Sequence, residues 1–209
     1  MSDAESVWTW GLAEFRDNVA ADNPTPGGGS AAMVSASIGM GLVLMALKIS
    51  ARKEGGDRHL PLVETGERLL VALGAQADDD IAAFQGYMKA LQLPKGTDEE
   101  KEARRRALEN AARTATEVPL AAARLCLEGL DLAQQAVPLA GSHIVSDVAA
   151  GAILMHGALS AVLLNVDINL KSIKDEAARA DYAALRADLQ TQGDARRARI
   201  DRDCAERLA

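Results

Sequence analysis

A run of proline and glycine at residues 24–30, with the sequence PTPGGGS, is the first feature that could do chemistry. Its two prolines fix the path of the backbone, and its three glycines allow positive φ and close approach by a ligand. The free N–H groups of a helix that begins here would attract anions or polar oxygens. The run lacks the Gly-Lys-Ser/Thr ending of a phosphate loop. It predicts either a ligand site or a glycine-rich start of a tightly packed helix, and its candidate binding residues are Pro26, Gly27, Gly28, Gly29 and Ser30.

Three consecutive aspartates, Asp78, Asp79 and Asp80, stand within an otherwise apolar stretch. On a helix these side chains point about 100° apart, so they cannot all face solvent and at least one should border the core. A carboxylate in that position has either a shifted pKa or a cationic partner. The alternative is a solvated acidic turn.

A second polar group, formed by His143, Ser146 and Asp147, stands at the start of an apolar segment. Here Ser146 or Asp147 can cap a helix, and polar groups converge near a helix N-terminus. The three residues do not make a hydrolase triad, whose members usually come from separate elements. Plain capping is the alternative to a functional role.

Two amides farther along, Asn165 and Asn169, are four residues apart and share one face of a helix. Buried amides need hydrogen-bond partners, which are either neighbouring residues or a ligand. Lys53 ends the first apolar segment, where a cation suits the helix dipole or reaches an anionic substrate. His59 and His156 are expected to be structural, and no His, Cys, Asp and Glu set has the spacing of a zinc site.

The elements that must position these residues are predicted to be helices. Of the 209 residues 48% are hydrophobic but only 3% are aromatic, and 41 are alanine, the best helix former. We expect one all-α domain over residues 1–209, an elongated helical bundle whose thin core of small side chains needs a partner subunit to finish its burial. The expected assembly is a homodimer.

Two uncharged segments, at about residues 23–47 and 148–166, are predicted to be the central helices of this bundle. Each is long enough to cross a bilayer. Both, however, are rich in Ser, Gly and Ala and have no aromatic belt, which favours burial in a soluble protein. The other expected helices span residues 3–20 and 58–91, a stretch opened by a capping box at Thr97 and kinked or divided at Pro119, and a charged segment from Asp175.

Charge and cysteine content limit the partners and the compartment. A net charge of −7 argues against nucleic acid, whose phosphates require a surplus of Lys and Arg. The two cysteines form no Cys-x-x-Cys unit, and the first residues lack the charged and apolar regions of a signal peptide. We expect a cytoplasmic protein that binds a small molecule and neither nucleic acid nor membrane.

Several separated motifs follow one order and spacing, and together they resemble the cyclodeaminase/cyclohydrolase family. This family comprises the C-terminal domain of formiminotransferase-cyclodeaminase and the free-standing bacterial methenyltetrahydrofolate cyclohydrolases. The resemblance covers about residues 5–205. The motifs are the PTPGGGS run, Asp80 before Ala83-Phe84, Leu93-Pro94-Lys95, Thr97 to Lys101, Val118-Pro119-Leu120, Ser146-Asp147 and Asn165 to Asn169.

The resemblance implies an all-helical fold that works as a dimer or a higher oligomer, a tetrahydrofolate derivative as substrate, and no metal or other cofactor. It also implies that the glycine run lines the folate site. Lys53 matches a lysine that follows the family's first long helix, Asp80 the acidic residue before Ala-Phe, and Asp147 the aspartate of Ser-Asp. His143 stands where relatives often have asparagine. Because few rings are available to stack on a pterin, Phe84, Tyr87 or amide contacts must hold it.

The expected reaction is the hydrolysis of 5,10-methenyltetrahydrofolate to 10-formyltetrahydrofolate. Asp147 and Asp80 are the candidate bases, with Asp147 ahead, and Lys53 or His143 places the water or donates a proton. Ser146, Asn165 and Asn169 join the glycine run as candidate binding residues, and we expect the N-termini of the two uncharged helices to converge on one folate site. The alternatives are an ammonia-releasing formimidoyltetrahydrofolate cyclodeaminase and a non-catalytic folate-binding bundle; the free-standing sequence favours the cyclohydrolase.

Overall fold

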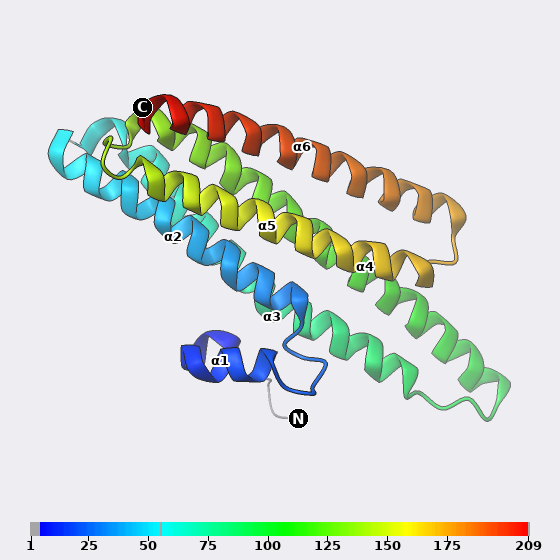
Figure 1. Cartoon of the computed structure of the whole chain (residues 1–209). Coiled ribbons are helices and arrows are strands. Elements are labelled where there is room, and N and C mark those ends of the chain that lie inside the picture. Colours follow the sequence, from blue (N-terminus) through cyan, green and yellow to red (C-terminus); the bar gives the residue numbers. More distant parts are fainter. Residues whose placement is uncertain (1–4, 55, 209) are drawn as a thin grey trace.

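The computed structural model describes residues 5–54 and 56–208, and within them the chain forms six α-helices and no strand. This confirms the all-α prediction. Short 3-10 helices and turns join the long elements (Figure 1). The helices are α1 (Leu12–Val19), α2 (Gly28–Glu54), α3 (Leu60–Leu91), α4 (Asp98–Ala136), α5 (Val145–Asn169) and α6 (Glu176–Leu208).

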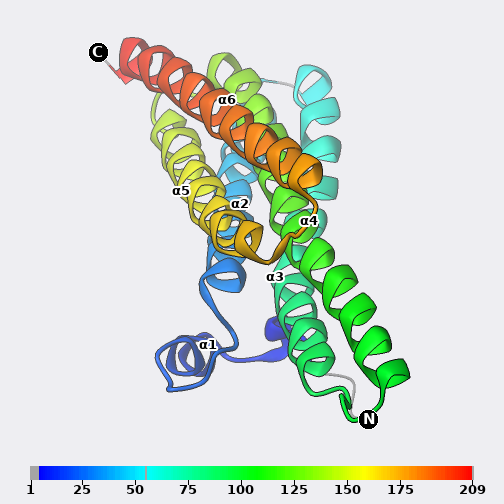
Figure 2. The ribbon, with the colours of Figure 1, turned by 90° about the vertical axis from the view of Figure 1, so that its right-hand side faces the viewer.

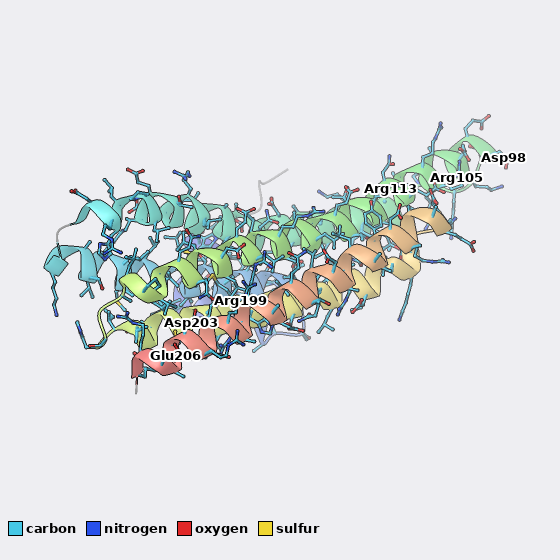
Figure 3. The ribbon with its side chains drawn as sticks, turned by 90° about the horizontal axis from the view of Figure 1, so that it is seen from above. Asp98, Arg105, Arg113, Arg199, Asp203 and Glu206 are labelled. Carbon is cyan, nitrogen blue, oxygen red and sulfur yellow. The ribbon has the colours of Figure 1, made fainter. Side chains whose placement is uncertain are left out.

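Four of these helices form an elongated bundle. Helix α2 packs on α3 and α5, and α4 packs on the same two helices from the opposite corner. Helix α6 lies over α4 and α5 and covers that side of the bundle (Figures 1 and 2). It carries many charged side chains, among them Arg199, Asp203 and Glu206, which are labelled in Figure 3.

The two helices that contain the uncharged segments, α2 and α5, pack against each other and run antiparallel. Gly29 lies beside Asn165 at one end, Gly39 beside Gly151 in the middle, and the Gly141 N–H donates to Ser50 Oγ at the other end (2.9 Å). A Cβ atom on Gly39 would lie 2.7 Å from the Gly151 carbonyl oxygen, so the two backbones approach as closely as glycine allows. Large side chains from both helices, including Met33, Met40, Leu47, Met155 and Leu159, fill the core.

Helices α2 and α5 are each long and apolar enough to cross a membrane by length and composition alone. In the most apolar 18-residue window of α2, 67% of the residues are buried inside the bundle, whereas the corresponding window of α5 is only 44% buried. The prediction of two central apolar helices is therefore confirmed, but α5 leaves much of its apolar surface uncovered.

Pro119 does not divide α4, which continues unbroken from Asp98 to Ala136. A proline inside a helix leaves the carbonyl four residues earlier without its usual N–H partner. That carbonyl belongs to Ala115, and the side-chain amide of Asn169 donates a hydrogen bond of 2.6 Å to it from α5. The helix therefore survives because a neighbouring helix supplies the missing donor.

The predicted helix over residues 3–20 is wrong in its extent, because Trp10 is extended and separates a 3-10 helix, Val7–Thr9, from α1. The first segment is held on α3 by hydrogen bonds from Ser6 Oγ and the Val7 N–H to the Asp78 carboxylate (2.6 and 3.0 Å). By contrast, no residue of α1 is fully buried, and of this helix only the half-buried Phe15 packs against the core. Helix α1 lies at the edge of the bundle, on the side away from α6 (Figure 1) and away from α4 (Figure 2).

Candidate functional site

A cavity of about 400 Å³ opens where the start of α2 meets α3, α4 and α5. Its volume lies within the range of small-molecule binding sites. Two parts of the chain that the sequence analysis singled out separately, the PTPGGGS run and the residue pair Asn165 and Asn169, meet at its wall. The lining residues are Pro24, Thr25, Gly27, Gly28, Gly29, Asp80, Ala83, Phe84, Tyr87, Ala115, Val118, Pro119, Asn165, Ile168, Asn169 and Ser172.

The Asp80 carboxylate is fixed in this cavity by donors from two other helices. The backbone N–H of Ser30, in the first turn of α2, donates to Asp80 Oδ2 (3.0 Å), and the Asn165 amide donates to Asp80 Oδ1 (3.3 Å). The fully buried Ser30 hydroxyl donates to the Ala77 carbonyl (2.5 Å) and also approaches Asp80 Oδ2 (3.4 Å). The start of α2 therefore binds a carboxylate of its own chain, as helix N-termini bind anions in general.

Burial raises the pKa of Asp80 above the ordinary range of an aspartate, although the hydrogen bonds from Ser30 and Asn165 oppose that rise. The structure gives no ion pair between Asp80 and a cation within the described residues. The sequence predicted either a shifted pKa or a cationic partner for a buried aspartate of this triplet. Asp80 has the shifted pKa. A carboxylate whose pKa is raised toward neutrality is better able both to accept and to release a proton.

The other two aspartates of the triplet face elsewhere. Asp78 binds the N-terminal segment as described above, and the exposed Asp79 accepts a hydrogen bond from the Gln76 amide (2.7 Å). The prediction that at least one of the three borders the core is confirmed by Asp80. A solvated acidic turn is excluded.

The glycines of the PTPGGGS run serve different purposes. A Cβ atom on Gly29 would overlap the Asp80 carboxylate and lie 2.7 Å from Asn165 Nδ2, so only glycine lets α2 approach these groups. A Cβ atom on Gly28 would meet no atom within 4 Å, although Gly28 lines the cavity. Gly29 is therefore required for packing around Asp80, and Gly28 leaves open the space in which a ligand would lie.

Phe84 and Tyr87, the aromatic residues predicted to contact a ligand, both line the cavity from α3. Phe84 lies about one turn and Tyr87 about two turns beyond Asp80 on the same helix. Two further lining residues, Ile168 and Ser172, were not predicted; they follow Asn165 and Asn169 by three residues each and so continue the same face. That periodicity was the signal by which they could have been found.

The second polar group lies at the opposite end of the bundle. Lys53 Nζ lies 3.1 Å from His143 Nε2, both side chains are exposed, and Ser146 and Asp147 occupy the first turn of α5 close by. Lys53 is 25 residues from Gly28 along α2, a distance of about 38 Å at 1.5 Å per residue. Because α2 and α5 are antiparallel, their N-termini do not converge within one subunit, and none of these four residues lines the cavity.

The N-cap of α5 also differs from the predicted Ser146 or Asp147. Its N-cap is Ile144, which makes no side-chain capping hydrogen bond, so neither Ser146 nor Asp147 caps the helix. The hydroxyl and the carboxylate of these two residues therefore remain available for other contacts.

The remaining histidines have structural contacts. His59 is buried and its Nε2 lies 3.0 Å from the Leu139 carbonyl oxygen, while His156 Nε2 lies 2.7 Å from Asp194 Oδ1 of α6. Within residues 5–54 and 56–208, no group of three or more His, Cys, Asp or Glu side chains is arranged to hold a metal ion.

A second pocket adjoins the cavity. Tyr87 and Ser172 line both, and Lys171 and Lys174 line the second pocket. On its α4 side, Arg105 is paired with Glu102 and Glu109 (2.6 and 2.8 Å). Figure 3 labels Arg105 and Arg113 on this part of α4. Among the described residues the structure gives no ion pair for either lysine, so both charges are available at the exit of the cavity.

The sequence is similar to those of several known proteins. Residues 11–187 match the family model described as formiminotransferase-cyclodeaminase. The chain is 37% identical over 170 residues to a methenyltetrahydrofolate cyclohydrolase of Methylorubrum extorquens, a match that covers 79% of this chain and 82% of that protein. It is 32% identical over 173 residues to the formimidoyltransferase-cyclodeaminase of Gallus gallus, of which the match covers only 31%.

The fold also has a solved counterpart. The crystal structure of a formiminotetrahydrofolate cyclodeaminase from Thermotoga maritima superimposes with a TM-score of 0.85 at 25% sequence identity. The superposition covers 98% of this chain and 100% of that one.

Proposed function

The chain belongs to the formiminotransferase-cyclodeaminase family, and from this premise we propose that it hydrolyses 5,10-methenyltetrahydrofolate to 10-formyltetrahydrofolate. The observation that carries the proposal is the Asp80 carboxylate, held without a cationic partner among the described residues in a cavity of about 400 Å³. The cyclohydrolase relative supports it because the similarity extends over most of both chains.

The substrate explains why a lone carboxylate is useful. One carbon bridges N5 and N10 of methenyltetrahydrofolate as a positively charged amidinium, so Asp80 attracts the reacting group itself. Hydrolysis begins when water attacks that carbon and loses one proton. Asp80, fixed by Ser30 and Asn165, is placed to accept this proton.

The second step breaks a bond in the tetrahedral intermediate. The bond from carbon to N5 breaks as the new hydroxyl becomes the formyl carbonyl, and its proton passes to solvent. N5 receives the proton that Asp80 took from the water, which returns Asp80 to the carboxylate. The overall reaction consumes one water and releases one proton, and it requires no redox partner.

The cavity and its exit suit the remaining parts of a folate. Phe84 and Tyr87 provide the ring faces on the wall of the cavity beside Asp80. The glutamate carboxylates at the other end of the substrate would then extend past Ser172 toward Lys171 and Lys174. This orientation places opposite charges together at both ends of the ligand.

We propose no cofactor, because the bridging carbon already has the positive charge that activates it toward water. We place the reaction in the cytoplasm, on the acidic composition and on two free, buried thiols, Cys126 and Cys204.

The second candidate is a formimidoyltetrahydrofolate cyclodeaminase, which the similarity to the Thermotoga maritima protein favours. In that reaction N10 attacks the formimino carbon and ammonia leaves, and the product is the same methenyl bridge. Both reactions pass through a tetrahedral carbon between N5 and N10, so one cavity could hold either.

A side-by-side assay separates these functions. We expect the purified protein to remove the near-ultraviolet absorbance of methenyltetrahydrofolate with a turnover of about 1–1,000 per second, typical of enzymes. We expect no ammonia above the buffer rate from the formimino compound. Ammonia release would instead identify a cyclodeaminase, and folate binding without either reaction would identify a non-catalytic binder.

We also propose that the protein is a homodimer, with α2 and α5 at the interface. Ile153 on α5 is 51% exposed, so Ile153→Glu should place a charge in the contact and weaken the dimer at least about 100-fold, since each interface contains the substitution twice. The matched control is Val71→Glu, at a position on α3 that is 72% exposed. Native mass spectrometry over a dilution series should show monomers for the first variant alone; equal behaviour of the two would contradict this interface.

A further inference from the structure

Pro119 is a residue of the cavity wall that breaks a local rule of helix formation. It stands inside α4, a helix of 39 residues, where a proline removes a backbone hydrogen bond and its ring crowds the preceding turn. Its side chain is buried and lines the cavity together with Ala115 and Val118. Residues that break such rules are typical of functional sites, yet no step of the proposed reaction uses Pro119.

The carbonyl that Pro119 leaves without its helical donor fixes the orientation of the Asn169 side chain. Asn169 Nδ2 donates to the Ala115 carbonyl oxygen at 2.6 Å. Because a backbone carbonyl can only accept a hydrogen bond, the amide nitrogen must face α4 and the amide oxygen must face away from it. Any other residue at position 119 would donate its own N–H to Ala115, which would then no longer need the Asn169 amide. Pro119 therefore locks this amide.

The oxygen of the locked amide is left as an acceptor for a ligand. Asn169 is half-buried and lines the cavity. Among the described residues no group donates to Asn169 Oδ1, and this oxygen is not one of the unpartnered atoms that are sealed from solvent. An amide oxygen that cannot turn favours a ligand with an N–H group at that place, and it disfavours one with an oxygen there.

The position of Asn169 along the cavity indicates which part of a ligand meets it. Asn169 is one turn of α5, about 6 Å, beyond Asn165, which binds Asp80. Lys171 and Lys174 follow at the exit. With the bridging carbon at Asp80 and the glutamate carboxylates at the two lysines, the benzoyl ring and its amide link to glutamate lie between them. That amide has the one N–H group of this stretch of the substrate.

We propose that Asn169 Oδ1 accepts a hydrogen bond from the amide N–H that joins the benzoyl and glutamyl parts of the substrate, and that Pro119 is the positioning residue that orients it. The identity of the N–H group rests on the proposed function, because that function supplies the ligand. The dependence of the Asn169 orientation on Pro119 rests on the geometry of α4 and α5 alone. An unfavourable proline in α4 thus contributes to substrate recognition while the chemistry stays at Asp80.

The first test compares two substrates that differ at this N–H group. One is methenyltetrahydrofolate, and the other is its depsi analogue, in which an ester oxygen replaces the N–H and both glutamate carboxylates are kept. We call the ratio of their KM values, ester over amide, the amide preference. It should be about 10 for the wild type, the value of one hydrogen bond, with little change in kcat. Asn169→Ala should lower it to about 1, because no acceptor remains to discriminate between the two groups. A wild-type preference of 1 would overturn the proposal.

The second test asks whether Pro119 acts through Asn169. Pro119→Ala returns an N–H to α4, so its melting temperature should at least equal that of the wild type, while its amide preference falls about 3–10-fold as the amide becomes free to turn. Asn169→Ala leaves the Ala115 carbonyl unpaired and should melt lower. The double variant should regain that stability and keep the preference of Asn169→Ala, since the two residues act as one unit. An unchanged preference in Pro119→Ala would overturn the positioning role.

A matched control excludes a general effect of stabilising a long helix. Gly86 is exposed within α3, does not line the cavity, and a Cβ atom on it would meet nothing within 4 Å. Gly86→Ala should therefore raise the melting temperature and keep the wild-type amide preference. If the wild type turns over neither substrate, the proposed hydrolase function fails. Calorimetric affinities for the same two compounds then decide the inference: tighter binding of the amide supports it, and equal binding or no binding overturns it.

Discussion

Replacing Asp80 with asparagine should lower kcat for methenyltetrahydrofolate by about 10²–10⁴-fold, the usual contribution of a positioned base. Asparagine has nearly the same shape and can still accept the hydrogen bond from the Ser30 N–H, but it cannot accept a proton from water. It also removes the negative charge that attracts the amidinium. A rate within threefold of the wild type would show that Asp80 is not the base.

The matched control for this substitution is Asp79→Asn. Asp79 is the adjacent carboxylate, but it is exposed, contacts Gln76 and does not line the cavity. Steady-state kinetics should give wild-type values for it. If both variants lose activity equally, the effect follows the charge of the helix and not a site at Asp80.

Asp80→Asn should not destabilise the fold. Burial raises the pKa of Asp80 in the folded protein, so its contribution to stability is present below the pKa of the unfolded chain and is lost as pH rises through the folded pKa. Above the folded pKa the ionised carboxylate therefore opposes folding, and at such pH values Asp80→Asn should have a melting temperature at least equal to that of the wild type. The raised pKa also predicts that kcat/KM rises with pH at a midpoint above the ordinary aspartate range, as the base becomes ionised.

The sequence could predict several of the residues that surround the cavity, because each of these carries a local signal. Three glycines after two prolines indicate close approach by another group, an aspartate triplet on a helix forces one carboxylate inward, and the spacing of Asn165 and Asn169 places both amides on one face. Each of these signals depends only on residues that are near in sequence. The structure brings all of them to one cavity.

That the N-termini of α2 and α5 lie at opposite ends of the bundle could not be predicted in this way. Whether two apolar helices lie parallel or antiparallel depends on the long elements between them, here α3 and α4. No residue in α2 or α5 indicates their relative direction. The same limit applies to Pro119 and Asn169. A proline predicts a break in a helix from local chemistry, but the donor that preserves α4 is the Asn169 amide, which lies 54 residues along the chain from its acceptor, Ala115.

Gly29→Ala should be the most damaging single-methyl change in the PTPGGGS run. The added Cβ would overlap the Asp80 carboxylate and lie 2.7 Å from the Asn165 amide, so either α2 or Asp80 must move. Such overpacking costs about 1–3 kcal/mol of folding free energy. Because a displacement of about 1 Å in a reacting group can cost about 100-fold in rate, kcat should fall by at least that factor.

Gly28→Ala separates packing from ligand binding at the neighbouring position. Its Cβ would meet no protein atom within 4 Å but would project from a residue that lines the cavity. The variant should keep the wild-type melting temperature while its KM for methenyltetrahydrofolate rises, since the added methyl group occupies space needed by the ligand and leaves Asp80 in place. Thermal unfolding and steady-state kinetics on both variants test this contrast. A folded, fully active Gly29→Ala would show that Asp80 tolerates displacement, and an unfolded Gly28→Ala would show that this glycine is also required for packing.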